Sequence, residues 1–357
     1  MRVAFVTVGD TSRLTGGYLY HAHVFTRLRE KGIEVETLVA SGASSTEQGA
    51  AASRFGSRFD SRRFDVIVVD ALARIVCAPW LDGWRESCPV VAMIHELPSV
   101  AAGRDAVLEQ EFEEPLLRAD HLIAVSNHGK SVLERRGVQS ERISVVSPGF
   151  DHLSPPDASV SRSSHEGSPV HALCVAQWIP RKDILGLVRA WTSRDRLEAI
   201  LELIGEKEIQ PAYSASIHVA IEEGGSSIRV RGPVDDAELE AAYEAADLFV
   251  LPSRYEGYGV VYAEALAHGL PVVACDVGPI PELVGKEAAL LVPPDDTEAL
   301  SAALDLLLKD SALRRRMSAA ACRRAEHLPR WKDTVAGFQR VLQKVLAEKR
   351  RSGRSSS

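Results

Sequence analysis

The sequence predicts an α/β protein with two doubly wound domains in tandem. Short runs rich in Val and Ile, bounded by Gly, Pro or Asp, alternate with longer segments of helical periodicity. This alternation is typical of parallel strands that are buried on both faces. The 357 residues suffice for two hydrophobic cores. Residues 152–169 lose all periodicity and are rich in Ser and Pro, which predicts a linker between the domains.

The first half of the chain carries six predicted strands. They are expected at residues 2–8, 34–39, 66–70, 90–94, 121–125 and 143–146. Residues 17–31 and 127–136 have helical spacing and end at Gly32 and Gly137. Glycine is the residue that most readily adopts the left-handed conformation after a helix, so both helix ends are well marked.

The second half repeats the alternation. Its strands are expected at residues 171–176, 198–203, 228–231, 247–251, 271–274 and 288–291. Helices near 235–244 and 297–308 follow Asp235 with Glu238 and Asp295 with Glu298, both at capping-box spacing. Residues 310–348 are almost entirely helical in pattern, and the final KRRSGRSSS is too polar to pack.

Composition argues against several classes of protein. The net charge of −7 argues against a general nucleic-acid binder, which needs a basic surplus to neutralise phosphates. The five cysteines are scattered without CxxC spacing, so we expect free thiols in a reducing, cytoplasmic compartment. The first apolar run is too short for a secretory leader, and no uncharged run of about 18 apolar residues predicts a transmembrane helix.

The most informative motif is SRYEGYGVVYAE at residues 253–264. A predicted strand ends before it, Gly257 and Gly259 lie in the loop, and a helical pattern follows directly. A glycine loop at a helix N-terminus presents unpaired N–H groups and the positive end of the helix dipole, which suits a phosphate. Glu256 and Glu264 flank this loop, and carboxylates accept hydrogen bonds from sugar hydroxyls. The combination favours a site for a phosphate and a sugar over an ordinary tight turn.

Three weaker signals lie at other strand ends. Thr15-Gly16-Gly17-Tyr18 follows the first strand and opens a helix, a pattern that phosphate loops and plain turns share. Arg181 and Lys182 follow the first strand of the second half, where they either neutralise a diphosphate or are simply solvated. His95 ends the strand at 90–94 and is either a ligand or a structural histidine.

Other chemistries are poorly supported. No GxGxxG occurs with an acidic residue placed for a dinucleotide ribose, so a dehydrogenase is not favoured. The chain has no Asp-x-Asp pair and no HExxH pattern, so we expect no metal site. It also has no serine nucleophile elbow.

These motifs together resemble the retaining glycosyltransferases of family 4, which have the GT-B fold. The resemblance covers nearly the whole chain, and its most specific element is the E-x7-E pattern within PSRYEGYGVVYAEALAHGLPVVA. Supporting segments are GG with REKGIEVETL after it, the strand ending IHE, ADHLIAVSNHGKSVL, VVSPGFD and RKD. The family implies two facing Rossmann-like domains and no cofactor apart from the nucleotide diphosphate sugar as co-substrate.

The resemblance also sets the expected domain boundaries. Residues 1–151 form the N-terminal, acceptor-side domain, and residues 170–330 form the nucleotide-sugar-binding domain after the linker at 152–169. A C-terminal helix at 331–348, anchored by Trp331, is expected to cross back to the first domain. Residues 349–357 are expected to be a disordered tail.

Three residues receive catalytic roles from the resemblance. His95 would lie near the anomeric centre, Lys182 would bind the diphosphate, and Glu256 would hold hydroxyls of the donor sugar. The implied donor-binding residues are Gly16, Gly17, Arg181, Arg231, Gly257, Tyr258, Gly259, Val260, Val261 and Glu264. Among them Glu264 would bind the nucleotide ribose, and the base would lie against the end of the strand before Gly232.

One departure from the family pattern is notable. The family usually has Gly-Arg-Leu where this chain has Ala176-Gln177-Trp178, so one phosphate-binding arginine is missing. Either Arg181 or Arg254 compensates, or the affinity for the diphosphate is lower.

The expected activity is transfer of a hexose from a UDP- or GDP-linked sugar to a hydroxyl, with retention and without a metal. Front-face attack, in which the leaving phosphate takes the acceptor proton, is favoured over double displacement with Glu256 as nucleophile. The alternatives are a nucleotide-sugar epimerase, a phosphorylase, and a catalytically weakened sugar-nucleotide-binding protein, the last motivated by Gln177. Products formed without an acceptor would indicate the epimerase, and dependence on inorganic phosphate would indicate the phosphorylase. Donor binding without turnover would indicate the binding protein.

The acceptor is not named by any residue type. The residues around Tyr18, Tyr20 and His21, and those from 41 to 64, are expected to shape a site for a small molecule, a glycan or a lipid. Within them, RFGSRFDSRRF at residues 54–64 interleaves arginines with phenylalanines. Such a segment either contacts anionic lipid or is an exposed helix face, and the acidic chain favours the exposed face.

Overall fold

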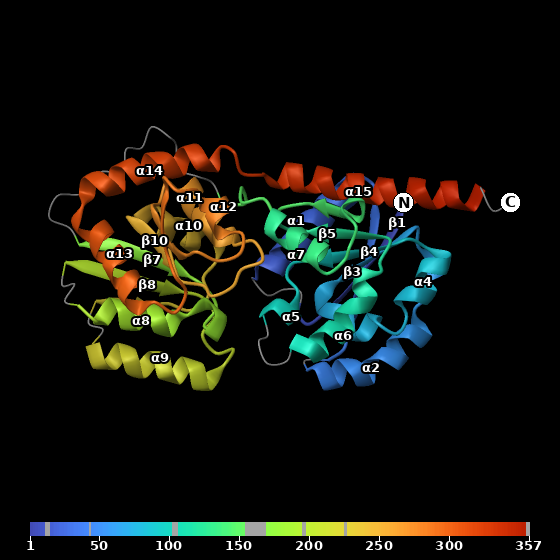
Figure 1. Cartoon of the computed structure of the whole chain (residues 1–357), viewed down its shortest axis with the longest axis horizontal. Coiled ribbons are helices and arrows are strands. Elements are labelled where there is room, and N and C mark those ends of the chain that lie inside the picture. Colours follow the sequence, from blue (N-terminus) through green and yellow to red (C-terminus); the bar gives the residue numbers. More distant parts are fainter. Residues whose placement is uncertain are drawn as a thin grey trace. The chain divides into compact units, whose positions relative to one another are not determined.

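The computed structural model describes residues 1–10, 15–42, 44–101, 106–153, 169–194, 198–224 and 227–354. The described chain divides into two compact units, each with its own parallel sheet (Figure 1). Unit 1 comprises Met1–Gly149 together with Pro329–Ser357, and unit 2 comprises Phe150–Leu328. Most of the expected linker, residues 154–168, lies outside the described residues.

Unit 1 contains a six-stranded sheet in the order β2-β1-β3-β4-β5-β6, with parallel pairing throughout. All six predicted strands are confirmed, with ends that differ by at most one residue. They are β1 Arg2–Val8, β2 Glu34–Ala40, β3 Val66–Asp70, β4 Val90–Ile94, β5 His121–Ala124 and β6 Ile143–Val145. Strands such as β3 and β4 are buried at every residue, which explains why they appear as uninterrupted apolar runs.

The described helices of unit 1 cover the sheet. They are α1 Gly16–Glu30, α2 Ser45–Arg58, α3 Arg74–Cys77, α4 Leu81–Ser87, α5 Pro98–Ala101, α6 Ala106–Leu117, α7 Asn127–Arg135 and α15 Trp331–Arg354. Short 3₁₀ turns lie at η1 Ser61–Arg63, η2 Ala71–Ala73 and η4 Ser140–Arg142. The two helix ends predicted from Gly32 and Gly137 are confirmed, with φ of 76° and 84° at these glycines.

Unit 2 repeats the plan with the strand order β12-β11-β10-β7-β8-β9. All six predicted strands are confirmed here as well: β7 Val170–Val175, β8 Ala199–Ile204, β9 Ile228–Val230, β10 Leu248–Leu251, β11 Val272–Cys275 and β12 Ala289–Val292. Its helices are α8 Ile184–Thr192, α9 Pro211–Gly224, α10 Asp236–Ala245, α11 Val260–Ala267, α12 Ile280–Val284, α13 Thr297–Lys309 and α14 Ser311–Ala325. A 3₁₀ turn, η5, spans Pro180–Lys182.

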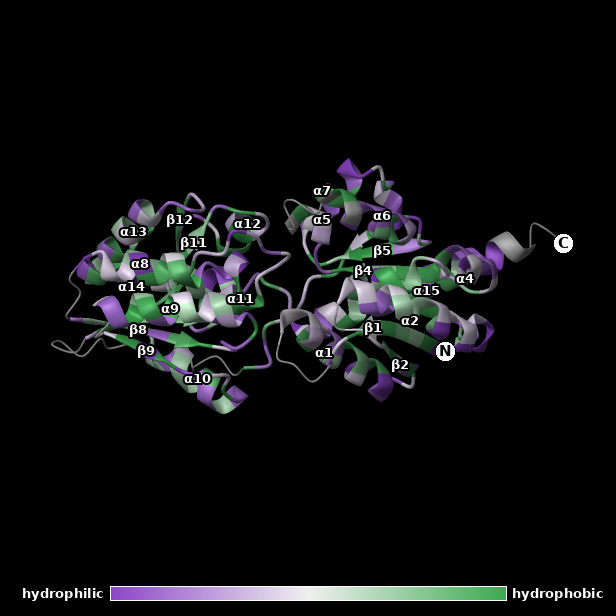
Figure 2. Ribbon diagram, turned by 90° about the horizontal axis from the view of Figure 1, so that it is seen from below, coloured by the Kyte–Doolittle hydropathy of each residue, from purple (hydrophilic) through white to green (hydrophobic). Residues whose placement is uncertain are grey.

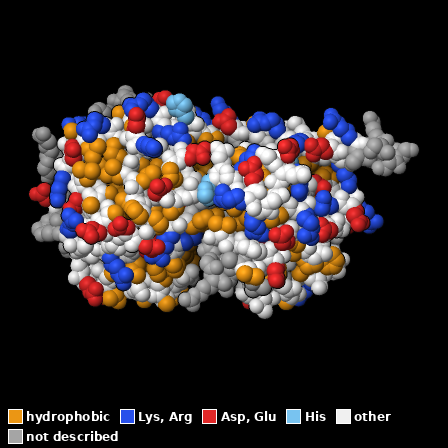
Figure 3. Space-filling view, in the orientation of Figure 1, with side chains coloured by type: hydrophobic (Ala, Val, Ile, Leu, Met, Phe, Trp, Pro, Cys, Tyr) orange, Lys and Arg blue, Asp and Glu red, His pale blue; other side chains and the backbone are white. Residues whose placement is uncertain are grey.

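The polarity of the residues follows this layering. Figure 2 shows hydrophobic residues concentrated on the strands and hydrophilic ones on the outer faces of the helices. On the face seen in Figure 3, basic and acidic side chains are interspersed, so no broad field of one sign covers it. Among the described residues, no helix combines the length and apolar character needed to cross a bilayer.

One of the two predicted capping boxes is confirmed and the other is wrong. At α10 the Asp235 carboxylate accepts from the Glu238 amide, and the Glu238 side chain accepts from the Asp235 amide. At α13 the cap is Asp296, whose side chain accepts from Ala299 N–H. Asp295 is unavailable because it has φ of 63° and pairs with Arg254 at 2.8 Å.

Helix α15 packs within unit 1 and is longer than expected. Trp331 is 1% exposed and lies near Tyr20, with ring centroids 6.1 Å apart. The helix continues to Arg354, so the expected disorder is wrong for residues 349–354. The ammonium of Lys349 donates to the carbonyls of Arg85 and Glu86, which holds this last segment against unit 1. The rest of the expected tail, 355–357, lies outside the described residues.

Candidate active site

Each sheet contains a point where the strand order reverses, and candidate residues follow the strands at that point. In unit 2, β7 and β10 are neighbours, and the loops after them carry Lys182 and Glu256. In unit 1, β1 and β3 are neighbours, and β4 lies beside β3. Open α/β sheets bind ligands beyond the carboxyl ends of strands at such reversal points.

Lys182 and Glu256 form a close ion pair in unit 2. The Lys182 ammonium lies 2.6 Å from Glu256 Oε1, which also accepts from the Ser253 hydroxyl at 2.7 Å. Glu256 is only 4% exposed. Burial alone would raise its pKa, but Lys182 and Arg181 hold the pKa below its ordinary value, so the carboxylate is charged at neutral pH. Its Oε2 lies 3.7 Å from Arg181 and retains capacity to accept further hydrogen bonds.

The structure distinguishes the two arginines that could replace the missing family arginine. Arg254 donates to Asp183 at 2.9 Å and contacts Asp295 at 2.8 Å, so its charge is already matched. Arg181 lies beside the ion pair and donates to the Tyr255 carbonyl at 3.3 Å. Gln177 donates to Glu206. Arg181 is therefore the arginine that accompanies Lys182.

The glycine loop opens helix α11 as the motif predicts. Gly259 has φ of 95°, and a Cβ there would lie 2.7 Å from the Tyr262 ring, so only glycine fits. The helix has no side-chain cap, which leaves the amides of Val260 and Val261 available for an anion. The loop residues before the cap, Gly257 and Tyr258, are half-buried. The Tyr258 hydroxyl is buried and makes no hydrogen bond to any described residue.

Glu264 lies one turn into α11 and is held by two side chains of unit 2. Its Oε2 accepts from the Tyr243 hydroxyl at 2.8 Å, and its Oε1 lies 3.2 Å from His152 Nε2. Tyr243 in turn stacks on His268, with centroids 5.0 Å apart. Burial opposes a charge on His152, but Glu264 raises the pKa of His152 above its ordinary value. His152 could not be recognised along the chain because it lies at the edge of the aperiodic segment.

This contact predicts a pH-dependent contribution to stability. Because the pKa of His152 is raised on folding, its stabilising effect is present below the unfolded pKa of about 6.5 and is lost as the pH rises through the folded value. We expect His152→Asn to lower the melting temperature more at pH 5.5 than at pH 8.5. In a Glu264→Gln background the same substitution should show no such difference. If His152→Asn lowered the melting temperature of the parent chain equally at both pH values, this account would be contradicted.

Arg231, expected near the nucleotide base, follows β9. Its guanidinium lies 3.3 Å from Glu202 and 3.0 Å from Glu238. About a third of its side chain is exposed, so it remains accessible to a ligand. Glu202 and Glu238 compensate the positive charge of Arg231. Its role toward the nucleotide base stays a prediction.

In unit 1 the predicted glycines lie at the start of α1. Thr15 caps the helix by accepting from the Tyr18 amide, Gly16 is exposed, and Gly17 is half-buried. A Cβ on Gly17 would lie 3.7 Å from the His95 ring, so this glycine and His95 are close neighbours. The structure thus brings together two of the residues expected near the reacting sugar.

A cluster of buried polar side chains lies behind His95. Its Nε2 lies 2.9 Å from His21 Nε2, and the same His21 atom lies 3.7 Å from Asp70. Asp70 is fully buried and accepts from the Thr7 hydroxyl and the Leu72 amide. Burial lowers the pKa of His21 to about 3 and the pKa of His95 to about 4, so both are neutral at pH 7.

Sequence reasoning missed this cluster. The sequence pattern places Asp70 at the end of a strand and predicts His21 at the acceptor. A carboxylate closing the otherwise apolar VIVVD was the available signal. The ligand atoms of His21, Asp70 and His95 lie within 4.8 Å of one another, so they are the group of described residues that could hold a metal ion. The absence of a metal stays a prediction.

The residues expected at the acceptor site are largely buried. Tyr18 is 9% exposed, and its hydroxyl donates to the Val8 carbonyl. Tyr20 is fully buried and donates to the Val146 carbonyl. His21 is 4% exposed. The structure gives these three side chains packing and positioning contacts, and their role toward an acceptor stays a prediction.

Two family profiles match the chain. The profile described as Glycosyltransferase Family 4 matches residues 20–152, and that described as Glycosyl transferases group 1 matches residues 169–310. The D-inositol 3-phosphate glycosyltransferase of Corynebacterium glutamicum is 30% identical over 302 residues, which cover 77% of this chain and 71% of that protein. The chain belongs to glycosyltransferase family 4.

Further similarities place this family 4 chain among GT-B proteins. The MMP alpha-(1->4)-mannosyltransferase of Mycolicibacterium hassiacum is 32% identical over 63% of this chain, and the match spans 54% of that relative. The sucrose-phosphate synthase of Thermosynechococcus elongatus has a TM-score of 0.81 at 23% identity, covering 97% of this chain and 99% of that one. Anabaena HepE in complex with UDP-glucose has a TM-score of 0.78 at 19% identity, with 96% and 100% coverage. The predicted fold class is confirmed.

Proposed function

We propose that this family 4 chain transfers a sugar from a nucleotide diphosphate sugar to a hydroxyl-bearing acceptor, with retention and without a metal. The observation that carries the proposal is the Lys182–Glu256 pair at 2.6 Å, in the loops after β7 and β10. A cation for a phosphate and a carboxylate for hydroxyls are the two groups that a nucleotide sugar requires. UDP- and GDP-linked sugars are the donors we favour, and the complex of the structural neighbour HepE with UDP-glucose supports the first of them.

Different residues of unit 2 bind the diphosphate, the sugar and the ribose of the donor. Lys182 and Arg181 neutralise the diphosphate, and the amides of Val260 and Val261 bind it at the positive end of α11. Glu256 uses its remaining acceptor capacity for hydroxyls of the donor sugar. Glu264, held by Tyr243, binds the ribose. As charge moves onto the departing diphosphate, these fixed donors and cations stabilise it more than they stabilise the ground state.

The residues of unit 1 supply polar groups that carry no charge. Nε2 of His95 forms a hydrogen bond with His21, and we assign its Nδ1 to a hydroxyl of the donor sugar. Because burial keeps both histidines neutral, neither repels the positive charge that develops on the sugar ring. His21 shares a hydrogen bond with His95, and the Thr7 hydroxyl donates to Asp70 beside it, so these contacts hold the ring of His95 in place. The acceptor proton then passes to the leaving phosphate oxygen.

The donor site is tested by ligand-induced stabilisation. Because a ligand that binds only the folded state raises the melting temperature, UDP, GDP, ADP, TDP and their sugars are compared in a thermal-shift assay. We expect one nucleotide to raise the melting temperature selectively and Glu264→Gln to abolish most of that rise. Glu222→Ala, an exposed acid of the same unit, should retain the rise. If no nucleotide raises it, or if Glu264→Gln retains the full rise, the proposed donor site is wrong.

A second candidate is a protein that binds the sugar nucleotide without turning it over. Gln177 favours it, because the side chain donates to Glu206 and brings no charge to the diphosphate. Product analysis with a panel of hydroxyl acceptors distinguishes the two. Our proposal predicts a product of retained anomeric configuration that still forms after EDTA treatment. Donor binding with no product, from any acceptor in the panel, favours the second candidate.

A further inference from the structure

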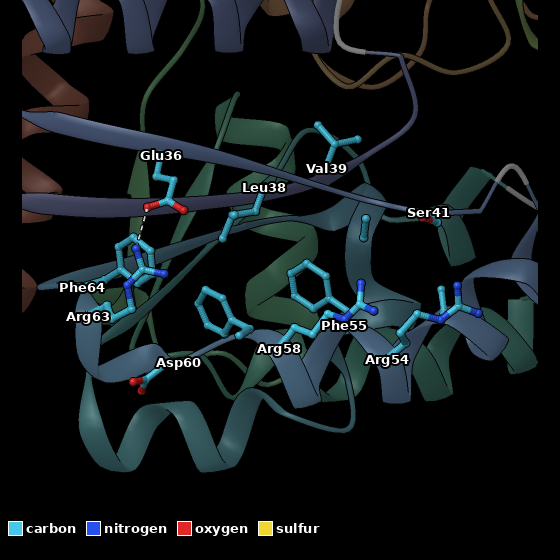
Figure 4. Close-up of a pocket in the computed structure, with 13 residues that line it drawn as sticks. Glu36, Leu38, Val39, Ser41, Arg54, Phe55, Arg58, Asp60, Arg63 and Phe64 are labelled. Atoms are coloured by element: carbon cyan, nitrogen blue, oxygen red, sulfur yellow. Dashed lines mark ion pairs between the residues drawn. The ribbon is translucent and has the colours of Figure 1, made fainter.

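A pocket of about 230 Å³ lies along β2, an edge strand of unit 1. The mechanism proposed above uses none of its residues, although the sequence predicts that residues 41–64 help to shape an acceptor site. One wall is the face of β2 that carries Leu38 and Ala40, and the other is helix α2 with the turn after it (Figure 4). Apart from residues of β2, Ser41 after it and Ala51, the lining falls in the arginine- and phenylalanine-rich segment at residues 54–64. The structure therefore gives that segment a concave site.

The floor of the pocket is aromatic. Phe55, Phe59 and Phe64 form a stacked row, with centroids 5.8 and 5.6 Å apart and interplanar angles of 15° and 12°. Trp84 contacts Phe59 edge-on from behind, at 4.7 Å. Phe55 and Phe59 are only half-buried, so part of the row faces solvent. A planar or aliphatic group placed there would remove from water both its own apolar surface and that of the phenylalanine rings.

The rim of the pocket carries two arginines without a partner among the described residues. Arg54 and Arg58 are one helical turn apart on α2, both are exposed, and neither side chain has an ion pair or hydrogen bond there. Figure 4 shows both on the side of α2 that faces β2, beside Phe55. Like charges at this spacing repel each other, so an anion bound between them would relieve the repulsion.

The acidic residues of the pocket are matched by other arginines. Asp60 is bound by Arg62 at 3.0 Å, and Glu36 lies 3.7 Å from Arg63. The charges of Arg54 and Arg58 therefore remain uncompensated, although the whole chain has a net charge of −7. Two such cations beside an aromatic floor are complementary to an anion that carries an apolar group.

We propose that this pocket is a second ligand site, which binds a small amphipathic anion. An aryl or short acyl group packs against the phenylalanine row, and its carboxylate or phosphate accepts hydrogen bonds from Arg54 and Arg58. The volume is below the roughly 300–1,000 Å³ of sites that hold drug-sized ligands, so the ligand is small. This site goes beyond the proposed transfer reaction and does not depend on it.

Phenyl phosphate is the probe, and its binding to the full chain is measured by isothermal titration calorimetry. We expect saturable binding that weakens at least tenfold in Arg54→Gln/Arg58→Gln, with little binding of inorganic phosphate or phenol. Arg135→Gln, which removes an exposed charge from α7 of the same unit, should bind as the parent does. Ala51→Leu, which fills the pocket without changing its charge, should also weaken binding. Lys182→Gln should bind phenyl phosphate normally, which separates this pocket from the proposed donor site.

Three results would overturn the proposal. The first is unchanged affinity in the double arginine variant. The second is inorganic phosphate binding as tightly as phenyl phosphate, which would show a site for anions alone. The third is no saturable binding of phenyl phosphate. Binding to phosphatidylglycerol vesicles in its place would make the segment a membrane-contacting surface.

Discussion

Replacing Lys182 with glutamine is expected to lower kcat by about 10²–10³-fold, the range seen when one preorganised stabiliser of transition-state charge is removed. Glutamine can still hydrogen-bond Glu256 but brings no charge to the departing diphosphate. Because the missing charge matters most after the glycosidic bond breaks, kcat should fall more than KM rises. Initial rates over a range of donor concentrations measure both parameters.

The matched control for Lys182 is Lys309→Gln. Lys309 belongs to the same unit, and 78% of its side chain is exposed. Its substitution therefore removes a solvent-exposed charge. We expect this variant to retain parental kcat. A kcat for Lys182→Gln within about threefold of the parent would remove Lys182 from the mechanism. Arg181 would then be the next cation to test, because it lies 3.7 Å from the same carboxylate.

Replacing Trp331 with alanine is expected to destabilise unit 1 by about 3–5 kcal/mol, the usual effect of deleting a large buried aromatic side chain. Trp331 is 1% exposed, lies 6.1 Å from Tyr20, and stacks on His23 at 4.3 Å. The chain comes so close here that a Cβ on Gly149 would lie 2.2 Å from Trp331 N. The gap left by alanine therefore has a rigid backbone wall, which limits how far the site can collapse.

Denaturant unfolding followed by circular dichroism measures this loss. Lys332→Ala is the control, since the neighbouring side chain is exposed on the same helix turn. Trp331→Phe keeps an aromatic ring and should lose less stability than alanine. A loss below about 1 kcal/mol for alanine would mean that α15 adds little to unit 1, because buried large-to-small changes rarely have so small an effect.

The fold could be predicted from the sequence because its strands are buried on both faces. A segment such as Val66–Asp70 has no polar face to interrupt it, so its bounds follow directly from the residues. The end of the chain was harder to predict. The polar residues 349–354 extend an amphipathic helix whose apolar face is already anchored by Trp331 and Phe338. Composition near a terminus does not reveal that continuation.

The candidate site could be predicted only in part. Glu256, Gly259 and Lys182 lie where loops follow strands, and such positions can be recognised along the chain. The contacts of His21 with Asp70 and His95 depend on which strands become neighbours in the sheet. A histidine on the buried face of a helix fits the helical periodicity of the sequence equally well whether it only packs in the core or positions another residue. Periodicity therefore cannot distinguish the two roles. One of the two partners of Arg254 was likewise hard to predict, because Asp295 lies 41 residues away and adopts a left-handed conformation.

The place of α15 in unit 1 has a consequence for synthesis of the protein. Unit 1 begins at the first residue, yet its last helix is made only after all of unit 2. In the folded protein Trp331 and Phe338 pack against Tyr20 and Phe25 of α1. During translation this surface of α1 stays uncovered while about half of the chain is still to be made. Unit 2, whose residues are contiguous, can finish folding first. The order of completion is therefore the reverse of the order in which the two units begin.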